Sequence, residues 1–183
     1  MKIQRCELFP EILIVEPDVF RDERGFFVET YRVERYIACG MEVSFVQDNL
    51  SYSTERVLRG LHYQVGRAQG KLVWVAKGEI FDVVVDVRRS SPTFGRWFGM
   101  RLRADAVTQI YIPEGFAHGF CVTSEEAIVC YKCTDYYSPA HERGIRWNDP
   151  DLGIEWPVSD PILSEKDARF PFLKDLGKDD LFP

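Results

Sequence analysis

Short segments with the character of β-strands recur along this chain, with turn signals between them. In residues 79–88 the side chains alternate, so that Phe81 and Val83 share one face while Asp82 and Asp86 share the other. A period of two is typical of a β-strand. Further segments of this kind are 11–16, 26–31, 43–53, 57–64, 71–77, 96–103, 108–112, 116–122 and 127–134. A strand every 8–12 residues, roughly, predicts an all-β sandwich or barrel.

The rest of the chain adds few helices to this pattern. Residues 32–38 predict a short helix that ends at Gly40, and Ser164 is placed to begin a second one near the C-terminus. Residues 138–163 are rich in Pro, Asp and Trp, which indicates a packed loop, and residues 174–183 are expected to form a loosely held tail. A length of 183 residues is enough for one core, so we expect a single domain over the whole chain, 1–183.

The charge and composition argue against several classes of partner. A formal net charge of −6 leaves no basic excess to neutralise the phosphates of a nucleic acid polymer. A small phosphorylated ligand stays compatible, because a few local arginines and lysines can hold it. No apolar run approaches the roughly 20 residues that cross a bilayer, and the first residues lack the apolar core of a signal peptide. Five scattered cysteines are typical of reduced thiols. We therefore expect a soluble cytoplasmic protein without a membrane partner.

Two motifs raise the question of a bound metal. Cys130 and Cys133 resemble half of a zinc site, but residues three apart in a strand point to opposite faces, so we interpret them as packed thiols. Residues 113–118, Pro-x-Gly-x-x-His, resemble the second motif of the cupin superfamily of small jelly-roll barrels. The first motif of metal-binding cupins carries two histidines and a glutamate, whereas residues 62–64 read His-Tyr-Gln. Because a catalytic metal needs about three protein ligands, we predict a barrel without a metal or other cofactor.

Three apolar segments carry polar side chains that must find a partner or face a cavity. They are 57–64, which contains Arg59 and His62, together with 112–120 and 129–133. Burying such groups unpaired costs about 2–7 kcal/mol each. We therefore predict that these segments line the inside of one barrel and form a site there. The polar run Gln-Asp-Asn that precedes them by a few residues is compatible with a turn or bulge and equally with a polar cluster that faces a ligand.

The polar residues in and near these segments fit proton transfer. His62 and His118 are candidate bases, Lys71 is a nearby cation, and Tyr131 is a candidate acid. Base, acid, cation and an orienting carboxylate are what proton abstraction next to a carbonyl requires. We expect Lys71 and Lys132 to lower the pKa of Tyr131 from its reference value near 10, which would help it to donate a proton.

Eight motifs between residues 22 and 167 resemble those of one family, and the resemblance runs from about residue 11 to residue 173. The motifs are Asp22-Glu23-Arg24-Gly25-Phe26-Phe27-x-Glu29, Gln47-Asp48-Asn49, Leu58-Arg59-Gly60-Leu61-His62-x-Gln64, Gln69-Gly70-Lys71-Leu72-Val73, Ser91-Pro92-Thr93-x-Gly95, Ile112-Pro113-x-Gly115-Phe116-Ala117-His118-Gly119-Phe120, Tyr131-Lys132-x-Thr134-x-Tyr136-Tyr137 and Leu163-Ser164-x-Lys166-Asp167. In this order and spacing they are similar to the dTDP-4-dehydrorhamnose 3,5-epimerases, cupin-type epimerases of nucleotide-linked keto sugars. The resemblance implies a cupin-type jelly-roll β-barrel with a few short helices, mainly C-terminal.

The resemblance also implies an activity and a dimer. The activity is inversion of C3 and C5 of dTDP-4-dehydro-6-deoxy-D-glucose to give dTDP-4-dehydro-L-rhamnose. A proton is removed next to the C4 ketone and another is returned from the opposite face of the sugar. Members of the family are homodimers whose N-terminal strands cross over, so Arg24 or Phe27 is expected to reach the site of the partner subunit.

Single residues receive roles from the same resemblance. His62 is the base with Asp167 as its orienting carboxylate, Tyr131 is the acid, and Lys71 stabilises the enolate oxygen. Tyr137 is implied to stack on the thymine ring. The full set implied in substrate binding is Arg24, Glu29, Gln47, Asp48, Asn49, Arg59, Gln64, His118, Tyr137, Glu142 and Lys166.

Some points stay open at this level. Strand alternation puts Arg59 and His62 on opposite faces, which a bulge at Gly60 would resolve. Asp167 either orients His62 or only caps a helix, and Asp82 is a rival partner for the histidine. The alternative activities are a 3- or 5-monoepimerase or a ketoisomerase of a related dTDP-4-keto sugar. A non-catalytic sugar-binding cupin is a further alternative, although such a module needs no base and acid.

Overall fold

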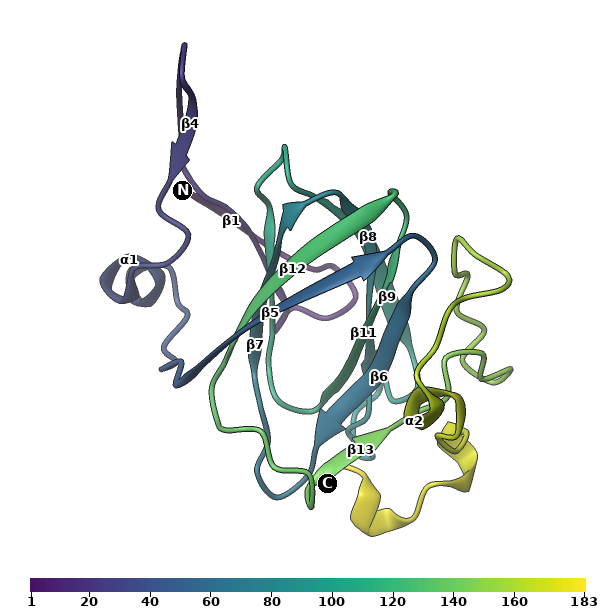
Figure 1. Cartoon of the computed structure of the whole chain (residues 1–183). Coiled ribbons are helices and arrows are strands. Elements are labelled where there is room, and N and C mark those ends of the chain that lie inside the picture. The colour runs from purple at the N-terminus through teal and green to yellow at the C-terminus, as the bar shows by residue number, and fades with distance from the viewer.

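The computed structural model describes residues 1–183 as two facing β-sheets with a projecting hairpin (Figure 1). The first sheet has the order β1-β2-β10-β7-β12-β5, with β1 at Lys2–Arg5, β2 at Leu13–Glu16, β10 at Gln109–Ile112, β7 at Lys71–Lys77, β12 at Glu126–Cys133 and β5 at Gln47–Thr54. The second has the order β13-β6-β11-β8-β9, with β13 at Glu142–Gly144, β6 at Leu58–Gln64, β11 at Phe116–Val122, β8 at Glu79–Asp86 and β9 at Trp97–Arg103. Every strand pair is antiparallel. The predicted all-β architecture is confirmed.

The helices are few and short. Helix α1 spans Val33–Ala38, within the predicted range, and α2 spans Glu165–Ala168. Two single 3-10 turns follow at Leu173–Asp175 and Lys178–Asp180. No helix is both long and apolar enough to cross a membrane.

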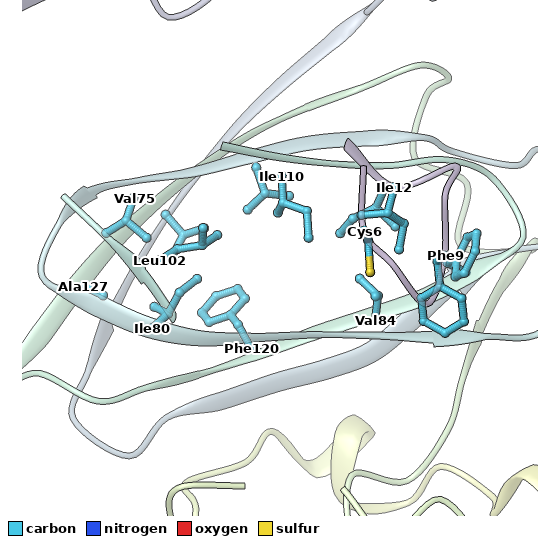
Figure 2. Packing of buried hydrophobic residues seen from close by; sticks show 14 of the residues in the cluster. Cys6, Phe9, Ile12, Val75, Ile80, Val84, Leu102, Ile110, Phe120 and Ala127 are labelled. Carbon is cyan, nitrogen blue, oxygen red and sulfur yellow. The ribbon is translucent and has the colours of Figure 1, made fainter. Parts of the chain in front are cut away.

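Side chains from both sheets fill the space between them (Figure 2). Val75 and Ile110 come from the first sheet, and Ile80, Val84 and Phe120 come from the second. All five are at most 5% exposed, and a buried side chain of this size stabilises the fold by about 1.5–3 kcal/mol. Because the residues of β8 alternate between the two faces, the opposite face of this strand must be covered by something else.

The C-terminal part of the chain covers that outer face of the second sheet. Val83 and Val85 pack there against Ile145 and Leu181. The backbone N–H of Phe182 donates to the carbonyl of Val87 at 3.2 Å. The expectation of a loose tail at 174–183 is therefore corrected: the tail is docked, because the outward valines of β8 need an apolar cover and the tail supplies it.

A two-stranded hairpin projects from the body of the molecule near the N-terminus (Figure 1). It consists of β3 (Val19–Asp22) and β4 (Gly25–Val28), which pair only with each other. The side chains of Phe20, Phe26 and Phe27 are 62%, 50% and 68% exposed. Three phenylalanines with this exposure on one hairpin form an apolar surface that the barrel of the same chain leaves uncovered.

Candidate active site

A cavity of about 730 Å³ opens between the two sheets and gathers most of the predicted site residues. It contains all four residues predicted for catalysis and eight of those predicted for binding. The twelve are His62, Lys71, Tyr131 and Asp167, with Gln47, Asn49, Arg59, Gln64, His118, Tyr137, Glu142 and Lys166. They come from both sheets, from α2 and, for Tyr137, from the loop between β12 and β13, so the fold brings together segments that lie far apart in the sequence.

Three residues predicted to bind substrate lie outside this cavity. Arg24 is at the tip of the hairpin, where its guanidinium bonds to the carboxylate of Asp22. Glu29 accepts a hydrogen bond from Arg35 at 3.3 Å. Asp48 pairs with Lys132 at 2.7 Å on the exposed side of β5. Asp48, which the family resemblance implies in substrate binding, does not line this cavity, because strict alternation in β5 turns its two neighbours inward and Asp48 outward.

A bulge at Gly60 turns both Arg59 and His62 towards the cavity. In the pairing of β6 with β11, His62 lies opposite His118, and Arg59 lies opposite Phe120. Two steps along β11 therefore match three steps along β6, which is the signature of an inserted residue. Gly60 has a φ of +122°, and a Cβ there would come within 2.5 Å of a backbone atom of the facing strand. The expected bulge is confirmed, and it removes the conflict with strand alternation.

His62 is held by the buried carboxylate of Asp167. Its Nε2 lies 2.8 Å from Oδ1 of Asp167, and Oδ2 of the same carboxylate accepts from the backbone N–H of Gly60 at 3.2 Å. Burial raises the pKa of Asp167. The hydrogen bond and the charge of His62, together with the contacts of Gly60 and Ser164, lower it by more, so the pKa lies below its usual range. An ionised Asp167 accepts a hydrogen bond from the Nε2–H of His62, which leaves the lone pair on Nδ1 free to take a proton from a ligand.

The two alternatives for this carboxylate are resolved by the same contacts. Ser164 is the N-cap of α2, and its hydroxyl accepts from the backbone N–H of Asp167 at 3.1 Å. The carboxylate of Asp167 is thus available to His62. Asp82 bonds instead to Nε2 of His118 at 2.8 Å, and its other oxygen, Oδ1, is buried without a partner.

Lys71 and Tyr131 lie on the sheet that faces the histidines. Burial lowers the pKa of Lys71, against the opposing effects of Cys133, Asp82 and Glu142. Burial also raises the pKa of Tyr131, with Cys133 adding to the rise and Arg59 opposing it.

The expectation that lysines lower the pKa of Tyr131 is wrong. The ammonium of Lys132 lies 2.7 Å from Asp48 and 5.1 Å from the centre of the Tyr31 ring. Lys132 follows Tyr131 directly in β12, so it points to the other face of the sheet. Loss of water around the phenol therefore decides the direction of the shift. A raised pKa keeps Tyr131 protonated at neutral pH, as an acid must be.

The mouth of the cavity is a hydrogen-bonded cluster of charged and aromatic groups. The hydroxyl of Tyr137 donates to Glu142 at 3.0 Å, and the ammonium of Lys166 donates to both oxygens of Glu142 at 2.8 and 3.0 Å. The side chain of Gln47 accepts from the backbone N–H of Tyr137 at 2.8 Å. Gln64 binds the backbone of the neighbouring loops with both ends of its amide, accepting from Ser138 at 2.7 Å. Its contribution is therefore to hold the cavity wall.

The cavity also contains residues that were not predicted to belong to the site. Among them are Ser51, Ser164 and Cys133. The hydroxyl of Ser51 is buried without a hydrogen-bond partner. The signal was available for Ser51, since it continues the inward row of Gln47 and Asn49 at a spacing of two.

The arrangement supports proton transfer from two sides of a bound molecule. His62 comes from β6 of the second sheet, whereas Tyr131 and Lys71 come from β12 and β7 of the first. A ligand in the cavity therefore meets an imidazole on one wall and a phenol with an amine on the other. No group of three or more His, Cys, Asp or Glu side chains is arranged to hold a metal ion.

Comparison with known proteins gives one consistent family. Residues 7–175 match the family model of dTDP-4-dehydrorhamnose 3,5-epimerase. A dTDP-4-dehydrorhamnose 3,5-epimerase of Pseudomonas aeruginosa is 55% identical over 185 residues, covering 100% of this chain and 100% of the relative. The crystal structure of a dTDP-6-deoxy-D-glucose-3,5-epimerase from Legionella pneumophila, in complex with dTDP-4-keto-L-rhamnose, has a TM-score of 0.95 and 48% identity. It covers 99% of this chain and 97% of its own. A dTDP-4-dehydrorhamnose 3-epimerase of Streptomyces niveus is 40% identical over 92% of this chain and 83% of its own.

Proposed function

Because the chain belongs to the dTDP-4-dehydrorhamnose 3,5-epimerase family, we propose that it carries out this family's reaction with His62 as the base and Tyr131 as the acid. The enzyme is an isomerase that inverts C3 and C5 of dTDP-4-dehydro-6-deoxy-D-glucose and gives dTDP-4-dehydro-L-rhamnose. The observation that carries the assignment of roles is the position of His62 and Tyr131 on opposite sheets. Inversion requires a proton to leave one face of the sugar and another to arrive on the opposite face.

The C4 ketone makes both inversions accessible to one pair of groups. It acidifies the hydrogens on C3 and on C5, so Nδ1 of His62 can take either proton. The electron pair of the C–H bond moves to the ketone and forms an enolate. Tyr131 then donates its hydroxyl proton to the other face of the same carbon, and solvent restores both side chains. A positioned general acid or base contributes about 10²–10⁴-fold to the rate.

Lys71 stabilises the negative charge of the enolate in this proposal. Its ammonium has no protein partner within hydrogen-bonding or ion-pair distance, although it lines the cavity. A cationic donor that is largely removed from water interacts strongly with charge that develops on the C4 oxygen. Loss of one such donor costs about 2.7–4 kcal/mol of transition-state stabilisation. Asp167 supports the reaction from behind His62 by holding its Nε2–H.

The polar mouth of the cavity binds the dTDP part of the substrate. Arg59 and Lys166 supply cationic donors for the diphosphate, and Tyr137 stacks on the thymine ring. Arg59 is held by the hydroxyl of Ser53 at 3.0 Å, and Lys166 is held by Glu142. Gln47, Asn49 and His118 complete the polar wall around the sugar.

We also propose that the active form is a homodimer in which the hairpin of one subunit reaches the cavity of the other. Phe20, Phe26 and Phe27 are too exposed for an isolated subunit. Arg24 lies on the same hairpin, outside the cavity of its own chain. A cytoplasmic location agrees with five unpaired cysteines.

Proton NMR of the reaction in D₂O tests the function directly. With dTDP-4-dehydro-6-deoxy-D-glucose as substrate, we expect deuterium at both C3 and C5 together with the inverted configuration. Activity is expected to persist in a chelator, in line with the predicted absence of a metal. Deuterium at C3 alone would indicate a 3-epimerase, which is the activity of the Streptomyces niveus relative. Absence of exchange at both carbons would contradict the proposal.

A further inference from the structure

The ring of Phe170 packs against the base from the side of the C-terminal segment. The rings of His62 and Phe170 lie with centroids 5.5 Å apart at an angle of 71°, an edge-to-face contact. Phe170 follows α2, the helix that carries Asp167. Its backbone carbonyl accepts from the guanidinium of Arg146 at 2.9 Å. One short segment thus supplies both the carboxylate that bonds to His62 and an aromatic ring beside it.

Gly144 makes the space that this ring occupies. It lies in β13 directly opposite His62 in β6. A Cβ at position 144 would come within 2.5, 2.5 and 2.6 Å of three atoms of the Phe170 ring. The backbone of Gly144 lies outside the left-handed region, so the conformation itself does not require glycine. The glycine is therefore needed for the ring, which fills the place of a missing side chain beside the base.

We propose that Phe170, seated on Gly144, is a positioning residue that fixes the plane of the His62 imidazole. This inference rests on the role of His62 as the base. The side chain of His62 is 26% exposed, whereas that of Asp167 is 4% exposed. The exposed side of the imidazole has no protein contact that would stop the ring from rotating. The phenyl ring blocks that rotation and keeps Nε2 on Asp167, which leaves Nδ1 aimed into the cavity.

Two variants on different elements are expected to have the same effect. Phe170→Leu removes the flat ring. Gly144→Ala pushes the ring of Phe170 away from β13. Misplacement of a catalytic group by about 1 Å costs on the order of 10²-fold, so we expect kcat to fall about 10–100-fold in each, with KM nearly unchanged. Deuterium exchange at C3 is expected to fall in parallel. Phe170→Tyr keeps the ring and is expected to keep kcat within about threefold.

A second readout reports on His62 without any turnover. Nitrogen-15 NMR of the imidazole is expected to show one tautomer, protonated at Nε2, in the wild type and a mixture in Phe170→Leu and Gly144→Ala. The matched control is Phe172→Leu in the same segment. Phe172 lies 4.8 Å from the guanidinium of Arg146 and makes no ring contact with His62. The Phe172→Leu variant is expected to have a lower melting temperature, with kcat and the His62 tautomer unchanged.

The outcomes separate this inference from the proposed function. Folded Phe170→Leu with wild-type kcat and a single tautomer would overturn the inference, and so would an equal loss of kcat in Phe172→Leu. If Phe170→Leu does not fold, the comparison of Gly144→Ala with Phe172→Leu decides in the same way. If the wild type exchanges neither carbon, the proposed function fails, while the tautomer measurement still tests whether Phe170 positions His62.

Discussion

At the scale of single residues, the buried position that places Lys71 in the cavity also makes its charge destabilise the folded protein. Burial lowers the pKa of its ammonium. The charged form is therefore less favourable in the folded protein than in the unfolded chain. The charge of Lys71 therefore destabilises the folded protein most strongly below its lowered folded pKa. This destabilisation decreases as pH rises from that value to the unfolded pKa near 10.4, because the unfolded chain binds more protons than the folded protein in this range.

Lys71→Met is expected to stabilise the protein and to inactivate it. Removal of the desolvated charge raises the free energy of unfolding at neutral pH by about 0.5–2 kcal/mol, and the gain shrinks as pH rises. Exchange at C3 and C5 falls about 10²–10³-fold, because the enolate loses its donor. Urea unfolding at several pH values and NMR exchange measure the two effects. The control Lys132→Met, on the outer face beside Asp48, should show neither, and a less stable Lys71→Met at neutral pH would contradict the argument.

Tyr131→Phe is expected to separate proton removal from inversion. The variant keeps the ring, so packing changes little, and it keeps His62 and Lys71. The neutral phenol is the form expected at neutral pH, because the reference pKa of tyrosine is near 10 and burial raises the pKa of Tyr131. We therefore expect deuterium to wash in at C3 and C5 from D₂O while inversion is lost, most clearly at C5. The control is Tyr36→Phe, which removes a buried hydroxyl bonded to Gln109 at 2.6 Å outside the cavity. Inversion of C5 at near wild-type rate in Tyr131→Phe would assign the acid role to another group.

At the scale of elements, local sequence patterns predicted most strands but neither all of the shortest strands nor the long-range contacts. Alternation located β8, and it also holds in β5, where it turns Gln47 inward but Asp48 outward. The family motif includes Asp48, which lies outside the cavity of its own chain. Of the six strands with four residues or fewer, β2, β4 and β10 were predicted, whereas β1, β3 and β13 were not, because so short a run carries almost no periodicity. The pairing of His62 with Asp167 was outside the reach of any local pattern, since 105 residues separate them.

The bulge in β6 is the element that places Arg59 beside His62, and Gly60 is its requirement. Gly60→Ala forces a side chain into a positive-φ position, which costs about 1–3 kcal/mol. It also puts the new Cβ 2.5 Å from the Cα of Gly119. We expect a larger loss of stability than this strain alone, and a raised KM because Arg59 is turned away. Chemical unfolding and steady-state kinetics measure both.

The control for this variant separates strain from site geometry. Gly153 has a φ of +60°, and a Cβ added there would meet no atom within 4 Å, so it shares the unusual backbone without the close approach. Gly153→Ala should cost about 1–2 kcal/mol and leave KM unchanged. A Gly60→Ala protein with normal KM would show that Arg59 reaches the substrate without the bulge.

At the scale of the whole molecule, two ends of the chain meet apolar surface in different ways. The tail at 174–183 was expected to be loose because chain ends usually are, yet Leu181 and Phe182 cover the outer face of β8. The hairpin at 19–28 is the reverse case, because its phenylalanines stay exposed in the isolated chain. No pattern in the sequence distinguishes the two cases, because the surface that covers a segment lies elsewhere in the fold or on another subunit.

A complementation experiment tests whether the hairpin acts on the partner subunit. Arg24→Ala and His62→Ala each damage one part of a composite site, and each homodimer should be nearly inactive. After random subunit exchange, half of the dimers contain both variants. If Arg24 reaches the partner's cavity, each mixed dimer has one intact site, formed by His62 of one chain and Arg24 of the other. The mixture should then recover about a quarter of wild-type activity.

The same mixture distinguishes the alternative in which Arg24 serves its own chain. In that case neither site of a mixed dimer is intact, and mixing restores nothing. The matched control is Lys71→Ala mixed with His62→Ala, since both residues line the cavity of one chain and no exchange of subunits can rebuild a site. Light scattering on Phe27→Asp completes the test, because a charge on this exposed ring should dissociate the dimer while leaving the barrel folded. Recovery of activity in the control mixture, or a wild type that is active as a monomer, would contradict the crossed arrangement.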